Sequence, residues 1–249
     1  MTGAVLGIDV GGSSIKAAAV DLGAGRVIGS LLSAPTPHPS TPAALMPVLE
    51  TLAAKLPEAT GRAGIAFPSV VKTGTTLTAA NIDSGWLGLN SEALAAGALG
   101  RPVRFLNDAD AAGMAEMRFG SGRGCTGTVI MLTFGTGIGT ALFVGGKLFP
   151  NAELGHLELR GMEAEKWASA RVRTVERLDF AAWAARVNEY LLALHDLLWP
   201  DVFILGGAVS ARFAEFAPLL HSSAELRPAH FAGQAGVVGA ALAAVEAAD

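Results

Sequence analysis

The sequence has a single cysteine, Cys125, among its 249 residues. One thiol excludes an intramolecular disulfide framework, and it excludes every zinc or iron–sulfur site that needs several cysteines. Such a composition is typical of proteins kept in a reducing compartment. A cytoplasmic location is therefore expected.

Positive charge is also scarce. The 18 Lys and Arg residues stand against 22 Asp and Glu residues, which gives a formal net charge of −4. Without an overall positive field, neither nucleic acid nor an anionic membrane is an expected partner. Local groups must hold any anionic ligand.

Charged residues make up only 16% of the chain and the mean hydropathy is +0.44, so membrane-spanning segments have to be considered. The stretch between Arg123 and Lys147 carries no charge and is long enough to span a bilayer. Its central glycines would each weaken a helix by roughly 1 kcal/mol, so two buried strands around a loop are predicted instead. No signal peptide is expected either, because Asp9 interrupts the first apolar run.

Two segments of the chain share one pattern. Ile8–Ser14 and Leu132–Ile138 each contain an apolar strand, a small polar residue, an apolar residue and a Gly-rich turn that leads into a second strand. Asp9 and Thr133 occupy equivalent places, 124 residues apart (133 minus 9). The pattern predicts two β-hairpins and an α/β protein of two similar halves, with the active site between them.

The rest of the chain alternates between strand and helix patterns, as α/β proteins do. Helices are predicted over residues 41–56, 109–119, 181–198 and 236–248, and strands over residues 62–67, 103–106 and 202–205.

Gly-rich hairpin tips let backbone N–H groups converge on phosphate oxygens. Tight turns alone would explain one such tip, but two equivalent tips favour a phosphate chain held from both sides. No P-loop sequence is present, and the glycines of Gly135–Gly139 lack the dinucleotide-binding spacing. P-loop NTPases and Rossmann enzymes are therefore disfavoured.

Asn107 and Asp108 follow an apolar strand and precede a helix, which is where open α/β sheets bind ligands. They also suit a simple helix cap. In a site, the amide could orient a sugar hydroxyl while the carboxylate accepts its proton.

Glu153 and His156 lie three residues apart around Gly155 and can present paired acceptors to vicinal hydroxyls. An ordinary surface hydrogen bond is the alternative. As a zinc site the pair is weak, because no cysteine or second histidine is nearby. Glu165 taken alone is an ordinary solvated helix residue.

Taken in order, these segments resemble the ROK family of sugar kinases, within the actin/hexokinase/Hsp70 superfamily, over nearly the whole chain. Each motif alone is weak, but five in the right order are specific. They are the first phosphate segment Gly7–Lys16, the catalytic-aspartate segment Leu106–Ala109, the second phosphate segment Thr133–Gly139, the nucleoside-side segment Ile204–Gly207 and the terminal-helix start Ala235–Ala241.

One subgroup, the polyphosphate glucokinases, resembles the chain most in residues 80–83, 106–113, 131–137 and 153–158. The resemblance implies that Asn107, Asp108, Glu153, His156 and Glu165 contact glucose, with Asp108 as the catalytic base. Most of the family has a Cys-rich zinc loop after His156. Residues 160–165 take its place here, as in this subgroup, so no zinc is expected.

The family fold that the resemblance implies is a duplicated, ribonuclease H-like α/β fold of two domains with an interdomain cleft. Residues 1–107 with 236–249 would form the small domain and residues 108–235 the large one. A homodimer is also implied.

The implied reaction moves the terminal phosphoryl group of inorganic polyphosphate, or of ATP, to the 6-hydroxyl of glucose and gives glucose 6-phosphate. Asp9 would position Mg²⁺ through water. The implied donor-binding residues are Asp9, Gly11, Gly12, Ser13, Lys16, Thr133, Gly135, Thr136, Gly137, Gly206 and Gly207.

Three alternatives stay open. An ATP-dependent glucokinase or glucomannokinase would share every residue except the donor contacts. A ROK transcriptional repressor would need a helix-turn-helix domain, for which the first phosphate segment leaves no room. A chaperone-like or filament-forming ATPase would not need the sugar-binding pairs.

The donor preference rests on what each donor needs. ATP requires an adenine pocket, but the linker between Gly207 and Gly236 is short and offers mainly Ala, Phe and Leu. Polyphosphate requires a local cationic track, and it is the expected donor. The candidate cations are Lys16, Arg118, Arg123, Lys166, Arg171 and Arg173, although any one of them could be an ordinary surface charge.

Overall fold

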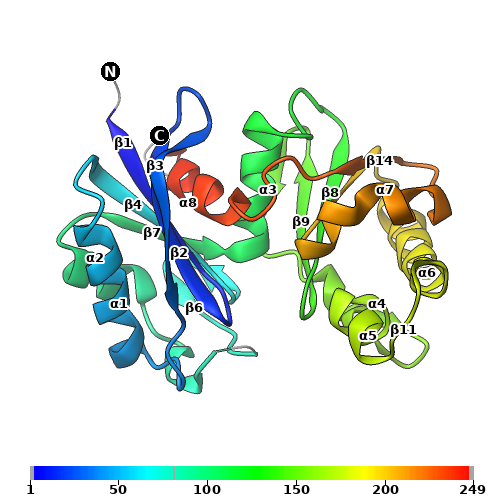
Figure 1. Ribbon diagram of the computed structural model, residues 1–249, viewed down its shortest axis with the longest axis horizontal. Helices are drawn as coiled ribbons and strands as arrows, with labels where there is room; N and C mark the ends of the chain where they lie inside the picture. The colour runs from blue at the N-terminus through cyan, green and yellow to red at the C-terminus, as the bar shows by residue number, and fades with distance from the viewer. Residues whose placement is uncertain (1–2, 81, 247–249) are drawn as a thin grey trace. The chain divides into compact units, whose positions relative to one another are not determined.

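The computed structural model describes residues 3–80 and 82–246, in two compact units (Figure 1). The first unit comprises Met1–Ala115 and Gln234–Asp249, and the second comprises Glu116–Gly233. The domain boundaries expected from the sequence, at 107/108 and 235/236, stay a prediction.

The first unit contains a five-stranded sheet in the order β3-β2-β1-β4-β7. Its strands are β1 Ala4–Val10, β2 Ser14–Asp21, β3 Arg26–Pro35, β4 Ala59–Phe67 and β7 Val103–Asn107. The hairpin of β1 and β2 is antiparallel and pairs Asp9 with Lys16, whereas β4 runs parallel to β1 and β7 parallel to β4. The first predicted hairpin is confirmed.

The second unit repeats this arrangement in the order β10-β9-β8-β13-β14. Its strands are β8 Thr128–Phe134, β9 Ile138–Val144, β10 Lys147–Phe149, β13 Val202–Gly206 and β14 Glu225–Pro228. Strands β8 and β9 form the second hairpin, and β13 runs parallel to β8 as β4 does to β1. The α/β architecture with an internal repeat is therefore confirmed.

Four of the five longer helices lie close to their predicted positions, namely α1 Pro42–Ala54, α3 Asp108–Phe119, α6 Phe180–Leu198 and α8 Ala235–Glu246. The fifth, α2 Ser91–Leu99, was not predicted. Helix α1 begins where Thr41 accepts a hydrogen bond from Ala44 N and proline takes the first turn. The prediction that α8 reaches residue 248 extends beyond the described residues.

Shorter elements connect this framework. They are β5 Val71–Lys72, β6 Thr75–Thr76, η1 Ser84–Trp86, η2 Leu154–His156, β11 Glu158–Leu159, β12 Met162–Glu163, α4 Ala164–Ala168, α5 Ala170–Val175, η3 Ala208–Arg212, α7 Phe213–Phe216 and η4 Ala217–Leu219.

Each unit has its own aromatic core. In the first, the Phe67 ring lies 4.6 Å from Trp86 and 5.3 Å from Phe105, centroid to centroid. In the second, Trp183 lies 5.4 Å from Phe134 and 5.2 Å from Phe216. The indole N–H of Trp183 donates to Ala168 O at 2.9 Å, so the core also ties α6 to α4.

Helix α8 packs against β1, β4 and β7 of the first unit and appears in red in Figure 1. The backbones of α8 and the sheet are in direct contact, because a Cβ at Gly64 would lie 1.7 Å from Ala240 O and a Cβ at Gly7 would lie 2.0 Å from Val237 O. Helix α8 approaches α3 in the same way, since a Cβ at Gly239 would lie 1.6 Å from Ala111 O. Only glycine permits so close an approach.

No helix within residues 3–80 and 82–246 is long and apolar enough to cross a membrane.

We predict that Gly239→Ala destabilises the protein by about 1–3 kcal/mol or more, because the added methyl group overlaps the α3 backbone. Gly97→Ala in α2 is the matched control, since its Cβ would meet nothing within 4 Å. That change should stabilise by about 0.5–1 kcal/mol through helix propensity. Chemical denaturation of both variants tests the contrast, and equal effects would contradict it.

Candidate functional site

Asp9 is a half-buried carboxylate near the end of β1. Burial raises its pKa, and the charge of Lys16 on β2 opposes that rise. A Cβ at Gly236, in the first turn of α8, would lie 2.6 Å from the Asp9 carboxyl carbon. Glycine at 236 therefore leaves the space that the carboxylate occupies.

The first Gly-rich tip connects β1 to β2. Gly11 N donates to Ser14 O at 3.0 Å and closes the turn. The hydroxyl of Thr36 donates to Gly11 O at 2.6 Å, and Thr36 N donates to Ser13 O at 3.1 Å. Thr36 thus holds the tip from outside, while Gly12 and Ser13 stay exposed. Thr36 was not among the predicted site residues, because no signal in the surrounding sequence marked it.

Asn107 and Asp108 are placed as predicted, at the end of β7 and the start of α3. The Asn107 Oδ1 accepts hydrogen bonds from Ala109 N at 2.8 Å and Asp110 N at 3.0 Å, and its Nδ2 donates to Ser69 O at 3.4 Å. Asn107 therefore does cap the helix. The cap fixes the backbone of the half-buried Asp108, whose Oδ1 also accepts from Ala109 N at 2.8 Å.

The second Gly-rich tip, between β8 and β9, lies in the second unit. Gly135 N donates to Gly137 O at 3.0 Å, and Thr133 Oγ1 donates to Gly139 O at 3.3 Å. Gly135 and Thr136 are exposed.

The Gly206–Gly207 turn after β13 lies against this tip. A Cβ at Gly207 would be 2.2 Å from Phe134 O, and Gly207 has φ +84°. The structure therefore brings together the second phosphate segment and the nucleoside-side segment, both predicted in the second half of the chain.

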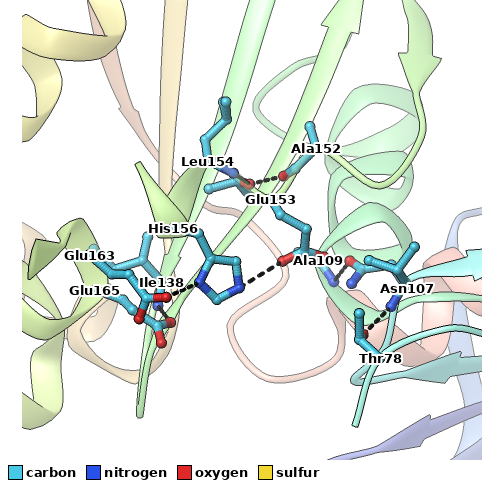
Figure 2. Close-up of polar contacts among 12 residues, drawn as sticks. Thr78, Asn107, Ala109, Ile138, Ala152, Glu153, Leu154, His156, Glu163 and Glu165 are labelled. Atoms are coloured by element: carbon cyan, nitrogen blue, oxygen red, sulfur yellow. Dashed lines mark hydrogen bonds and ion pairs between the residues drawn. The ribbon is translucent and has the colours of Figure 1, made fainter. Parts of the chain in front are cut away.

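His156 lies among three glutamates in Figure 2. Its Nδ1 is 3.3 Å from Glu163 Oε1, and its Nε2 is 3.8 Å from Glu153 Oε2. Glu165 Oε2 accepts a hydrogen bond from Ile138 N at 3.3 Å, which fixes that carboxylate beside the second tip. The predicted residues Glu153, His156 and Glu165 are thus gathered in one place.

The charges of this cluster are coupled. Burial raises the pKa of Glu153, the nearby His156 opposes the rise and Glu165 adds to it. Glu163, which was not among the predicted site residues, has its pKa lowered by a hydrogen bond from Lys166. Its place in the two-residue strand β12, paired with Glu158 on β11, explains the miss. Such a short hairpin has no periodic pattern.

His156, Glu163 and Glu165 each offer a ligand atom within 4.8 Å of the others, so this group could hold a cation. The ammonium of Lys166 already lies 2.7 Å from Glu163 Oε2 and competes for that carboxylate. Lys166 is consequently paired locally, which weakens its assignment to a cationic track.

The other candidate cations of the second unit fall into two groups. Arg118 and Arg123 are exposed at the end of α3 and in the following turn. Arg171 N donates to Gly135 O at 3.0 Å, which joins the start of α5 to the second tip. Two residues later, the Arg173 guanidinium carbon lies 4.0 Å from the centroid of the Phe180 ring.

Comparisons with known proteins give a consistent result. The sequence profile of the ROK family matches residues 5–178. The chain is 44% identical over 242 residues to the polyphosphate glucokinase of Mycobacterium tuberculosis. That alignment covers 96% of this chain and 90% of the mycobacterial protein.

Solved structures agree with that result. The inorganic polyphosphate/ATP-glucomannokinase of Arthrobacter sp. strain KM superimposes with a TM-score of 0.93 at 42% identity, covering 97% of this chain and 98% of that one. A ROK family glucokinase from Streptomyces griseus, solved with glucose and AMPPNP, gives a TM-score of 0.84 at 27% identity, over 98% and 100%. These neighbours confirm the actin/hexokinase-like fold expected from the sequence.

We predict that Asp9→Asn raises the melting temperature at pH 7.5. Because burial raises the pKa of Asp9, the folded state disfavours the ionised form and loses stability as the pH rises through that pKa. The advantage of the variant should therefore shrink as the pH is lowered toward 4.

Asp196→Asn serves as the matched control, because this side chain is 67% exposed and its neutralisation changes no buried charge. Melting curves across the pH range test the prediction. A difference between Asp9→Asn and wild type that grows on acidification would contradict it.

Proposed function

The chain belongs to the ROK family, and from this premise we propose that it phosphorylates the 6-hydroxyl of glucose with inorganic polyphosphate, giving glucose 6-phosphate. The observation that carries the proposal is the 44% identity to a polyphosphate glucokinase over 96% of the chain. It is supported by the gathering of Glu153, His156 and Glu165, and by the capped Asn107–Asp108 pair.

Asp108 is the catalytic base of this proposal. The Asn107 cap holds the first turn of α3, so the Asp108 carboxylate is carried on a rigid element. It accepts the proton of the glucose hydroxyl as the new phosphorus–oxygen bond forms.

Asn107, Glu153, His156 and Glu165 bind glucose in this proposal. Carboxylate and imidazole acceptors around η2 suit vicinal hydroxyls. The Ile138 N–H fixes the Glu165 carboxylate, which reduces the ordering cost of binding.

The donor is held by the Gly-rich tips and the residues next to them. In the first unit these residues are Asp9, Gly11, Gly12, Ser13 and Lys16, and in the second they are Thr133, Gly135, Thr136, Gly137, Gly206 and Gly207. Backbone N–H groups at such tips stabilise the charge that develops during transfer.

Asp9 fits a role in holding Mg²⁺, because a carboxylate oxygen is a ligand that Mg²⁺ accepts and the absence of a side chain at position 236 leaves room for this carboxylate. When bound, the ion neutralises charge on the phosphates. Zinc is not part of the proposal, since Cys125 is the only thiol and Lys166 competes for Glu163. Metal analysis of chelator-washed protein tests that exclusion.

A homodimer, which the family resemblance implies, and a cytoplasmic location, which the single cysteine favours, complete the proposal. The alternative is a broader activity, with ATP as a second donor and mannose as a second acceptor. The name of the Arthrobacter enzyme, a polyphosphate/ATP-glucomannokinase, favours including them in the assays.

Asp108→Asn should lower kcat by ~10² to 10⁴, because the amide keeps the size and hydrogen bonding of the side chain but cannot accept the proton. The KM for glucose and the melting temperature should stay close to wild type. Steady-state assays of glucose 6-phosphate with a melting curve test this. A variant that kept more than about a tenth of the wild-type kcat would reduce Asp108 to a helix-start residue.

Initial rates with glucose, using long-chain polyphosphate and ATP in parallel at matched Mg²⁺, test the donor. We predict a higher kcat/KM for polyphosphate than for ATP. The apparent affinity for polyphosphate should fall steeply with added salt, because several screened contacts weaken together. If the rate with polyphosphate equals that of a blank while ATP supports the reaction, the glucokinase assignment stays but the polyphosphate assignment is wrong.

A further inference from the structure

The guanidinium groups of two arginines lie over the ring of Phe180, at the start of α6. The Arg173 guanidinium carbon lies 4.0 Å and that of Arg212 lies 4.5 Å from the ring centroid. The two cations are therefore within 8.5 Å of each other, the sum of those distances. Like charges held this close repel, so the arrangement needs a compensating anion.

The protein supplies only part of that compensation. Arg212 forms two hydrogen bonds with Glu215, at 2.6 Å and 2.7 Å. Arg173 lowers the pKa of Glu215 as well, so both cations draw on the same carboxylate. The buried Arg173 Nε has no hydrogen-bond partner within the described residues. The neighbouring Asp179 uses its Oδ1 to cap α6 at Ala182 N.

A second ring in the same unit provides the comparison. Arg160 and Arg186 both lie over Trp167, at 5.2 Å and 4.1 Å. There each arginine has its own carboxylate: Arg160 binds Glu189 at 2.7 Å, and Arg186 binds Glu176 at 2.5 Å. At Trp167 each arginine pairs with its own glutamate, whereas at Phe180 two arginines share one glutamate. The Phe180 pair is left with positive charge.

Both arginines of the Phe180 pair connect to the Gly-rich tips through short segments. Helix α5 begins beside Gly135, where Arg171 N donates to Gly135 O, and it carries Arg173. The η3 turn begins after Gly207 and ends at Arg212. One segment that starts beside the second phosphate segment and one that starts at the nucleoside-side segment therefore end at one ring.

We propose that Arg173, Phe180 and Arg212 form a binding site for a linear polyanion, namely the stretch of polyphosphate that follows the phosphates held at the Gly-rich tips. This site rests on the proposed function. The phenyl ring orders the two guanidinium planes by stacking, and their N–H groups bind phosphate oxygens of the chain. No bond is made or broken there.

The test uses Arg212→Gln, Arg173→Gln and the double variant. Loss of a charge-assisted contact should raise the KM for long-chain polyphosphate about three- to tenfold for each single change. The KM for glucose, the KM for tripolyphosphate and the kcat should change much less, because a short donor ends before it reaches the ring.

Arg160→Gln is the matched control, since it removes the same charge from a stacked arginine of the same unit that has its own glutamate. Glu215→Gln tests the opposite direction. It removes the shared carboxylate, so the KM for long-chain polyphosphate should fall. A merely structural role of the pair would not produce tighter donor binding in that variant.

The outcomes separate the two proposals. If wild-type protein makes no glucose 6-phosphate from polyphosphate, the donor assignment fails and this site fails with it. If wild type uses polyphosphate but the Arg173 and Arg212 variants match Arg160→Gln, only this site is overturned. Should Arg173→Gln fail to fold, the exposed Arg212 and Glu215, at 52% and 50% side-chain exposure, still decide the question.

Discussion

The contact between α8 and the sheet of the first unit depends on the absence of side chains. At Gly7 and Gly64, carbonyl oxygens of α8 lie where any Cβ would be. Helix α8 is buried from Gly236 to Ala244, so this contact covers the face of β1 and β4. The same approach places Gly236 beside the Asp9 carboxylate. The close packing of α8 on the sheet therefore also sets the surroundings of Asp9, a residue proposed to bind the phosphoryl donor.

Most of the framework could be predicted because its strands are buried and apolar. The hairpins, β4, β7 and β13 lie close to their expected ranges, since each combines an apolar run with Gly-rich or polar ends. Strand β3 was missed because it is exposed over most of its length and has no buried run. The short α4 and α5 are fixed by tertiary contacts, such as the hydrogen bond from Trp183 to Ala168 O, which no local pattern reveals.

The sequence named candidate site residues but did not show which contacts hold them in place. Asn107 was expected either to cap a helix or to bind a ligand, and the structure shows that its Oδ1 caps α3. Capping alone does not exclude the second role, because the same cap positions Asp108. The links from Thr36 to the first tip and from Glu163 to His156 join segments distant in sequence or in very short strands. Such links have no periodic signature.

The first unit is discontinuous, and this has a consequence for the order in which a growing chain can fold. Residues 1–115 leave the ribosome first, yet α8, which covers β1 and β4, comes after the whole of the second unit. The second unit is a single continuous segment and can complete its sheet earlier. Until α8 has been synthesised, the backbone around Gly7 and Gly64 and the buried strands beside it stay uncovered. That interval exposes β-rich apolar surface, which makes the early half of the nascent chain the part most in need of chaperone protection.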